Sequence, residues 1–240
     1  MIRIGLLGAT GRMGQCVSKL LASDYAGRVT AGALVGRYKS DSELEPLLSC
    51  DAVIDFSLPE AMLPLVRIAL SAQEPKLPAF VVGSTGWKPA QLVELEALAA
   101  RLPVLASSNF STGVLALRRI LEDAAPLLKK LGYEPVLVDT HHRHKKDAPS
   151  GTALNLARTI EASGGGLPQV HSIRAGEVIG DHEVSYYGPA DKIVLGHFAQ
   201  DRSIFARGAI DAAIWLASRE QPRSARVLTM DDFMSESVLQ

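Results

Sequence analysis

Short apolar runs alternate with amphipathic stretches through the first half of the chain. Each run is short, rich in β-branched or aliphatic side chains, and bounded by glycine or polar turn residues, which is typical of buried strands. We expect strands at residues 2–8, 29–35, 51–56, 79–83 and 103–109. Strands that alternate with helices at this spacing favour a parallel sheet covered by helices on both faces.

The stretches between these runs have the periodicity of helices. From Arg12 onwards, apolar side chains recur at the period of one helix face, at Met13, Cys16, Val17, Leu20 and Leu21. Ser57 and Glu60 have the spacing of a capping box and predict a second helix, whose start is complicated by Pro64. Pro89 precedes the strongest helical pattern in the chain, residues 90–102.

The pattern changes from about Thr112. A long helical stretch to Leu131 is followed by a strand, a loop and a helix within residues 135–160. Three strand-like runs then follow at residues 172–180, 182–188 and 192–198. Because the connections are short, we expect these three strands to pair antiparallel in sequence order. The tail returns to helix.

This change predicts two domains. We assign residues 1–112 and 203–240 to an α/β domain, with the C-terminal helices packing back on it, and residues 113–202 to an α+β domain. Neither long linkers nor repeats interrupt the pattern.

Composition and charge narrow the class of protein. The chain has 25 basic and 26 acidic side chains among 240 residues, so its formal charge of −1 argues against a general nucleic-acid binder. No apolar run approaches the roughly 18 to 20 residues that a membrane span requires, and we expect no secretory signal at the N-terminus. Cys16 and Cys50 lie far apart and have no metal-ligand spacing. We expect a cytoplasmic protein with reduced thiols.

The first predicted strand runs into a glycine loop. Gly8, Gly11 and Gly14 stand between that strand and the start of a helix, where glycine permits a tight turn and lets a pyrophosphate approach the backbone. The helix N-terminus adds partial positive charge beside the same phosphates. An isolated glycine pattern is weak, but its position at this strand–helix junction favours a dinucleotide site.

The end of the second strand should determine which dinucleotide binds. A carboxylate there would accept the ribose hydroxyls of NAD, whereas a basic residue would pair with the additional phosphate of NADP. Gly36 and Arg37 occupy this place, Lys39 follows, and Asp41 comes late. Two ordinary surface cations are the alternative interpretation. We expect NADPH to be preferred over NADH.

A second cluster of chemistry-bearing residues is "HHRHKKDAPSGTAL", from His141 to Leu154. A metal site is disfavoured, since no thiolates or clustered carboxylates accompany the histidines and His141 and His142 would point to opposite faces of a strand. A solvated charge run is a second alternative. A third is an anion site, in which a helix that starts after Ser150 presents its N-terminus next to the cations. Ser150, Gly151 and Thr152 would let the backbone approach a carboxylate.

Five motifs together resemble one known family. The segments "GATGRMG", "VVGSTGW", "SSNFSTGV", "HHRHKKDAPSGTAL" and "RAGEVIGDHEV" are similar to those of dihydrodipicolinate reductases, over essentially the whole chain. The resemblance implies an N-terminal Rossmann-like domain and a second domain with an open mixed sheet that binds substrate and builds a homotetramer. It also implies the reduction of 4-hydroxy-tetrahydrodipicolinate to tetrahydrodipicolinate with NADPH or NADH, in lysine and diaminopimelate biosynthesis.

The resemblance assigns roles to individual residues. His141 and Lys145 would be the proton-donating pair, His142 would contact the substrate, and Gly151 and Thr152 would hold a substrate carboxylate. The cofactor would be lined by Gly8, Ala9, Thr10, Gly11, Arg12, Met13, Arg37, Gly83, Ser84, Thr85, Ser107, Ser108, Asn109 and Phe110. The sequence departs from the family at Gly36, where many members carry an acidic residue, which puts strong use of NADH in doubt.

The chemistry of the substrate agrees with these assignments but does not determine which residue donates the proton. A substrate with two carboxylates requires cations and a nearby proton donor, and the sequence leaves open whether His141 or Lys145 donates. A non-catalytic dinucleotide sensor would have no use for this cluster. A semialdehyde dehydrogenase would require a nucleophilic cysteine, and neither Cys16 nor Cys50 is well placed for that role.

Overall fold

A computed structural model describes residues 1–38, 40–74, 76–219 and 226–237. The chain forms two compact units. Unit 1 comprises residues 1–110 together with the C-terminal residues from Ser203, and unit 2 comprises residues 111–202. Among the described residues, no helix combines the length and the apolar character needed to cross a membrane.

Unit 1 is built on a five-stranded parallel sheet, as the alternating pattern predicts. The strands are β1 (Ile2–Leu7), β2 (Val29–Val35), β3 (Ala52–Asp55), β4 (Ala79–Val82) and β5 (Val104–Ala106), in the order β2-β1-β3-β4-β5. All residues of β3 and β4, the last four of β1 and the first two of β5 are buried, which explains why these segments are mostly apolar in the sequence. The order reverses direction at β1, so that β2 lies to one side and β3 to the other.

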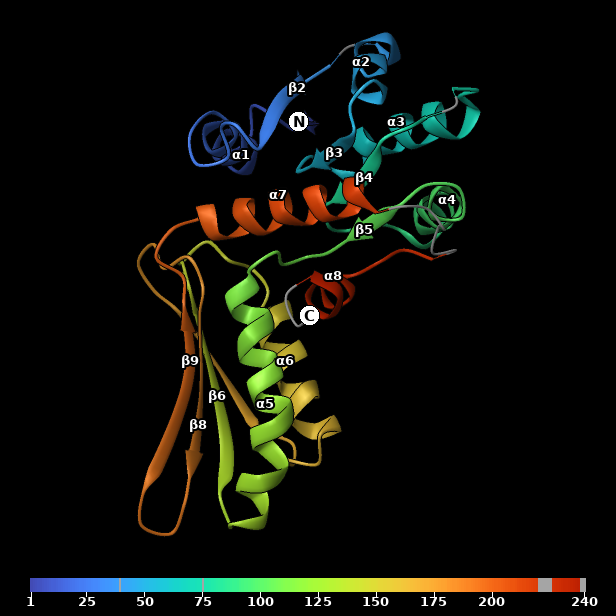
Figure 1. The fold of residues 1–240 in the computed structure, drawn as a ribbon. Coiled ribbons are helices and arrows are strands. Elements are labelled where there is room, and N and C mark those ends of the chain that lie inside the picture. The colour runs from blue at the N-terminus through green and yellow to red at the C-terminus, as the bar shows by residue number, and fades with distance from the viewer. Residues whose placement is uncertain (39, 75, 220–225, 238–240) are drawn as a thin grey trace. The chain divides into compact units, whose positions relative to one another are not determined.

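Helices cover both faces of this sheet (Figure 1). One face packs on α1 (Arg12–Ala22) and α7 (Ser203–Ser218), which also contact each other. The other face buries side chains from α3 (Pro59–Ser71) and α4 (Pro89–Ala99) in one apolar cluster with β3 and β4. The short helices η1 (Asp41–Glu43) and α2 (Glu45–Leu48) follow β2, and α8 (Met230–Ser237) follows α7.

The predicted capping box at Ser57 is wrong. Helix α3 begins at Pro59 with Leu58 at its N-cap, and none of the described side chains caps it. Ser57 instead donates its backbone N–H and its hydroxyl to the carboxylate of Asp55, two residues earlier. Ser57 therefore lies one residue before the N-cap and orders the acid at the end of β3, while Pro59, which has no N–H, starts the helix.

Unit 2 is a four-stranded mixed sheet covered by two helices. Its strands are β6 (Glu134–His141), β7 (Gln169–Arg174), β8 (Asp181–Tyr187) and β9 (Lys192–Phe198), in the order β7-β6-β8-β9. Helices α5 (Thr112–Lys130) and α6 (Gly151–Ala162) bury their apolar sides against Leu137, Val184 and Tyr186 of the sheet.

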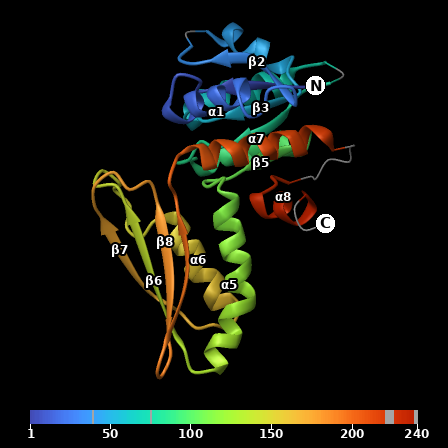
Figure 2. The same ribbon diagram turned by 60° about the vertical axis from the view of Figure 1, so that its left-hand side comes forward.

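The expected sequential antiparallel pairing holds for β8 and β9 but not for β7. Strand β7 pairs in parallel with β6 and does not neighbour β8 in the sheet. The reason is that α6 is a crossover helix between β6 and β7. It returns the chain to the end of the sheet where β6 begins, so that β7 runs in the same direction as β6. Figure 2 shows both helices on one side of the sheet, with no element of unit 2 on the other side.

Candidate active site

The predicted cofactor residues of unit 1 gather at one edge of its sheet. They follow β1, β2, β4 and β5, and all of these strands are parallel, so the residues share the carboxyl edge. Ligands of open α/β sheets bind at this edge, beside the point where the strand order reverses. Here that point lies between β1 and β3, next to the glycine loop.

The geometry of the glycine loop suits a pyrophosphate. Gly8 has a φ of 85°, and a Cβ at Gly14 would lie 2.2 Å from the Gly8 carbonyl oxygen, so that helix α1 starts closer to the loop than any side chain allows. Gly11 is the N-cap of α1, and no described side chain caps this helix. The first amides of α1, at Arg12 and Met13, therefore point their N–H groups and the helix dipole towards the loop.

The residue after β2 has no room for a side chain while Thr10 of the glycine loop keeps its present position. A Cβ at Gly36 would lie 2.6 Å from the Cγ2 methyl of Thr10. The position that would carry a ribose-binding carboxylate is thus closed by Thr10, while the neighbouring Arg37 is exposed. Lys39, which the sequence suggests as a helper of Arg37, lies outside the described residues.

A buried acid connects two loops of this edge and is not predicted from the sequence. The Asp55 carboxylate has no solvent exposure and accepts hydrogen bonds from Ser57 in one loop and from Ser84 in the next, with Ser84 Oγ at 2.5 Å. Burial raises the pKa of Asp55 above its ordinary value, against the opposing effect of these hydrogen bonds. Its place at the end of an apolar strand is the signal that could have identified it.

The loop after β5 is ordered by its own hydrogen bonds. Ser107 Oγ donates to the carbonyl of Asn109 at 2.7 Å and accepts from the Asn109 amide at 3.1 Å. Phe110 is buried, and its ring meets that of Phe56 edge-on at 5.7 Å between centroids. A ligand at this edge could therefore reach the backbone of Phe110 but not its ring. Thr85 and Ser108 are exposed.

In unit 2, the first histidine of the cluster is paired with an acid that is not predicted from the sequence. His141 is the last residue of β6, and its Nδ1 lies 2.9 Å from Oδ2 of Asp139, which has no solvent exposure. Asp139 also accepts hydrogen bonds from Ser172 and from Arg174, the latter at 3.1 Å, both on the adjacent strand β7. The register of the sheet, with Asp139 opposite Ser172 and His141 opposite Arg174, brings these side chains together.

Charge and burial determine the state of this acid–histidine pair. Burial raises the pKa of Asp139, but the hydrogen bond from Ser172 and the charge of Arg174 outweigh it and hold the pKa below the ordinary value. Asp139 is therefore an ionised acceptor, which fixes the proton of neutral His141 on Nδ1 and leaves Nε2 with a lone pair. Burial, and then the charge of Lys145, lowers the pKa of His141 below 6.5.

The other predicted substrate residues follow within the same loop and helix. Lys145 forms an ion pair of 2.9 Å with Asp147 and is mostly buried. Ser150 is the buried N-cap of α6, and its Oγ accepts the Ala153 amide at 3.1 Å. Gly151 and Thr152 form the first turn of this helix. His142 is half-buried and its ring lies 6.2 Å from that of His144.

This arrangement can hold an anion and exchange a proton. The N-terminus of α6 supplies partial positive charge, Lys145 supplies a full charge, and His141 supplies an oriented imidazole. Among the described residues, no three histidine, cysteine or acidic side chains are placed to share a metal ion. Cys50 is buried and Cys16 lies in α1, away from this loop in the sequence and in the other unit.

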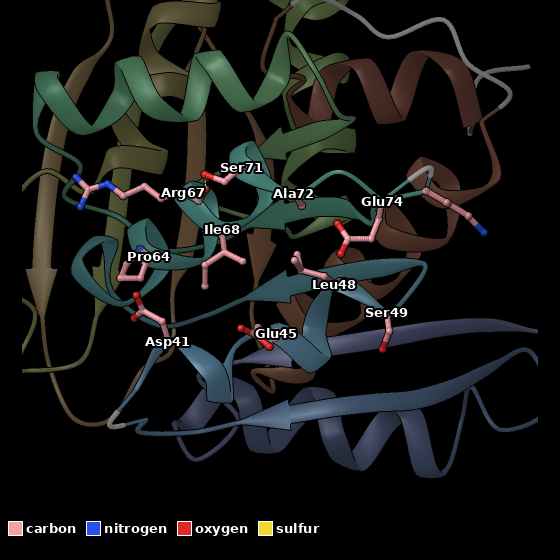
Figure 3. A pocket seen from close by; sticks show the side chains of 11 residues that line it. Asp41, Glu45, Leu48, Ser49, Pro64, Arg67, Ile68, Ser71, Ala72 and Glu74 are labelled. Atoms are coloured by element: carbon pink, nitrogen blue, oxygen red, sulfur yellow. Dashed lines mark hydrogen bonds between the residues drawn. The ribbon is translucent and has the colours of Figure 1, made fainter.

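A surface hollow of unit 1 lies elsewhere and is not built for the same chemistry. It has a volume of about 790 Å³ and is lined by α2, α3 and the segment after α3, with Glu45, Arg67 and Glu74 among its charged groups (Figure 3). None of the predicted site residues line it. Arg67 is already paired with Glu94 at 2.8 Å. The charged groups of this hollow are of both signs and are not arranged to bind one anion or one cation.

Comparison with known proteins covers both units. The family model "Dihydrodipicolinate reductase, N-terminus" matches residues 2–110, and "Dihydrodipicolinate reductase, C-terminus" matches residues 113–234. The chain is 40% identical to the 4-hydroxy-tetrahydrodipicolinate reductase of Stenotrophomonas maltophilia, over 94% of this chain and 96% of that protein. It is 35% identical to the protein of the same name from Sulfurimonas denitrificans, over 92% and 95%.

A solved structure has the same fold. Dipicolinate-bound dihydrodipicolinate reductase from Paenisporosarcina sp. TG-14 aligns with a TM-score of 0.72 and 20% identity, over 95% of this chain and 97% of that one.

Proposed function

The chain belongs to the dihydrodipicolinate reductase family, and from that premise we propose that it reduces 4-hydroxy-tetrahydrodipicolinate to tetrahydrodipicolinate with a nicotinamide cofactor, in lysine and diaminopimelate biosynthesis. The observation that carries this proposal is the family similarity over both units, together with the oriented His141 imidazole and the α6 N-terminus at the two ends of one loop. A non-catalytic dinucleotide sensor would need only the cofactor residues at the carboxyl edge of the sheet in unit 1.

The residues of unit 1 fit a nicotinamide dinucleotide. The glycine loop and the uncapped start of α1 would hold the pyrophosphate, and the loops after β4 and β5, from Gly83 to Thr85 and from Ser107 to Phe110, would line the rest. When bound, the reduced cofactor supplies the hydride. Asp55 keeps the loops after β3 and β4 in fixed positions at this edge.

The residues of unit 2 bind the substrate and supply the proton. One carboxylate would lie at the N-terminus of α6, against Ser150, Gly151 and Thr152, with His142 as a further contact. Lys145 would release Asp147 and move to the substrate as the proton donor. His141 would keep its Nδ1–H on Asp139 and accept a hydrogen bond through Nε2.

A turnover assay tests the reaction directly. The purified chain receives the condensation product of pyruvate and aspartate semialdehyde, and the oxidation of NADPH and of NADH is followed in separate reactions. We expect turnover with both cofactors. If neither NADPH nor NADH were oxidised, the proposed function would be wrong.

The cofactor preference follows from Arg37 and the closed position at Gly36. A charge-assisted bond from Arg37 to the 2′-phosphate would favour NADPH. We expect Arg37→Ala to lower kcat/KM for NADPH about 10-fold, since hydrogen bonds to charged groups contribute about 1.5–3 kcal/mol and Arg37 is exposed. The value for NADH, the internal control, should change less than threefold. An equal loss with both cofactors would contradict this assignment.

A second variant tests the closed position. Gly36→Glu alone places its Cβ against Thr10, whereas the double variant Thr10→Gly/Gly36→Glu makes room for the carboxylate. We expect only the double variant to gain efficiency with NADH relative to NADPH.

Gly180 limits the space beside the reacting imidazole. A Cβ there would lie 3.0 Å from Nε2 of His141, although the Gly180 backbone has no conformation reserved for glycine. We therefore expect Gly180→Ala to lower kcat about 10- to 100-fold by displacing the imidazole, with little change in the unfolding temperature. Steady-state kinetics and thermal unfolding measure the two quantities, and an unchanged kcat would show that Nε2 faces no reacting group.

A homotetramer and a cytoplasmic location are further parts of this proposal. The sheet face of unit 2 opposite α5 and α6 carries the exposed apolar side chains Ile173, Val194 and Phe198. An open apolar face of this kind suits contact with another copy. We expect Phe198→Glu to reduce the tetramer to smaller species in light scattering, whereas Leu127→Glu, at an exposed position on α5, leaves it intact. The free thiols Cys16 and Cys50 agree with a reducing compartment.

A further inference from the structure

A row of polar side chains crosses the sheet of unit 2 on its helix-covered face. Asp139 on β6 stands opposite Ser172 on β7 and His182 on β8, and His182 stands opposite His197 on β9. Asp139 belongs to the acid–histidine pair already described, and Ser172 donates a hydrogen bond to it. His182 and His197 lie outside that pair, and each ring contacts the N-cap serine of a helix.

His182 joins the start of α6 to the acid–histidine pair. Its Nε2 lies 3.2 Å from Oγ of Ser150, and its ring meets the ring of His141 edge-on at 5.3 Å between centroids. The side chain is 3% exposed. Its Nδ1 is buried and has no hydrogen-bond partner among the described residues.

This geometry favours one tautomer of His182. Burial lowers the pKa of His182 to about 4, so that the ring is neutral at physiological pH and carries one proton. A proton on Nδ1 would be a buried donor without an acceptor, and orphaned buried N–H groups are rarer than under-satisfied acceptors. A proton on Nε2 has an acceptor in Ser150 Oγ. The Nε2–H tautomer is therefore the one that this environment selects.

The tautomer in turn determines what Ser150 can do. A serine hydroxyl has two acceptor sites and one proton. The Ala153 amide uses one acceptor site at 3.1 Å, and His182 Nε2–H uses the other. The only remaining capacity of Ser150 is to donate, beside the helix N-terminus that would receive a carboxylate.

We propose that His182 is a positioning residue that makes Ser150 a dedicated hydrogen-bond donor to a carboxylate of the substrate. This inference rests on the proposed function, because it concerns the site that the substrate would occupy. The contact with His141 has a second consequence: an uncharged ring at position 182 adds no positive charge next to the acid–histidine pair.

Binding of a planar dicarboxylate tests the inference without turnover. The probe is dipicolinate, which occupies the relative from Paenisporosarcina, and its Kd is measured by calorimetry on the full chain. We expect His182→Phe, which keeps a ring against His141, to weaken binding about 10- to 100-fold, the range for a hydrogen bond to a charged group. KM for the substrate should rise by a similar factor, with kcat changed less than about threefold.

The neighbouring histidine provides a matched control. His197 Nε2 contacts Oγ of Ser111, the N-cap of α5, at 3.0 Å, and its Nδ1 is likewise buried without a partner among the described residues. His197→Phe therefore removes the same kind of contact from a different helix. We expect the Kd for dipicolinate to stay within about twofold of the wild-type value. An equal loss in both variants would indicate a general packing effect and overturn the inference.

Two further measurements separate the hydrogen bond from folding. His182→Gln retains an amide donor and should recover most of the binding lost in His182→Phe. In the double variant with Ser150→Ala, dipicolinate should bind no more weakly than to Ser150→Ala alone, because His182 acts through Ser150. Additive losses would overturn the inference.

The tautomer can be observed directly. The ¹⁵N shifts of the His182 ring in the full chain should report a protonated Nε2 and an unprotonated Nδ1, and the reverse assignment would overturn the inference whatever the outcome of the turnover assay. If wild type binds no dipicolinate and turns over no substrate, the proposed function fails, and this inference fails with it.

Discussion

Replacing Lys145 by alanine or His141 by glutamine is expected to lower kcat about 10²- to 10⁴-fold, the range typical of losing a positioned proton donor or acceptor. His141 ends β6 and Lys145 lies in the loop that follows; burial, and then the charge of Lys145, lowers the pKa of His141. Steady-state kinetics measure the loss. Lys146→Ala removes an exposed charge one residue away and is the matched control, with an expected change below threefold. Near-wild-type kcat in both primary variants would remove the pair from the mechanism.

The pH dependence separates the two candidates for the donor. His141 has a pKa below 6.5, so an imidazolium donor would lose its proton, and the enzyme its kcat/KM, as the pH rises through that lowered value. If Lys145 is the donor, loss of the His141 proton causes no such decline, because the neutral imidazole is then the working form. Since we propose Lys145 as the donor, we expect kcat/KM to stay level between pH 6.5 and 8. A steady decline through this range would assign the proton to His141.

Local patterns predicted the elements, since the information for each lies within a few residues. The glycine loop is one such case: a strand end, a turn that needs a φ of 85° at Gly8, and a helix start at Arg12 are all encoded within a short segment. The same holds for Ser150, which begins α6 where the sequence places its start.

Pairing between distant segments was not predicted. Strand β7 joins β6 because α6 spans the sheet, and the spacing of the three late runs contains no sign of this. Asp139 was not predicted either, since an acidic residue within a strand usually indicates a solvent-facing position. Only the register places Ser172 and Arg174, more than thirty residues later, around its carboxylate. Ser57 also has a role that depends on the fold: it donates to the carboxylate of Asp55, and the helix begins one residue too late for it, with Leu58 at the N-cap.

Asp139→Asn is an informative variant, because it removes the negative charge of the side chain without altering its shape. In Asp139→Asn, the amide can turn its NH₂ towards Nδ1 of His141, which shifts the histidine proton to Nε2 and converts an acceptor into a donor. We expect kcat to fall about 10²- to 10⁴-fold with a small change in KM, because a carboxylate that fixes a tautomer acts on the reaction step and not on binding. The ¹⁵N shifts of His141 should show the exchanged tautomer.

A variant that weakens the surroundings of Asp139 but keeps its carboxylate is the control for Asp139→Asn. Ser172→Ala removes one hydrogen bond from Asp139 but leaves its charge, Arg174 and the contact with His141 in place. We expect kcat to fall less than about 10-fold in this variant, with the Nδ1–H tautomer retained, since an ionised carboxylate still orders the ring. If Asp139→Asn kept kcat within threefold of wild type, the buried acid would serve the fold of unit 2 alone. A large loss in Asp139→Asn with an unchanged tautomer would mean that the negative charge acts directly, by stabilising a protonated His141 in the transition state.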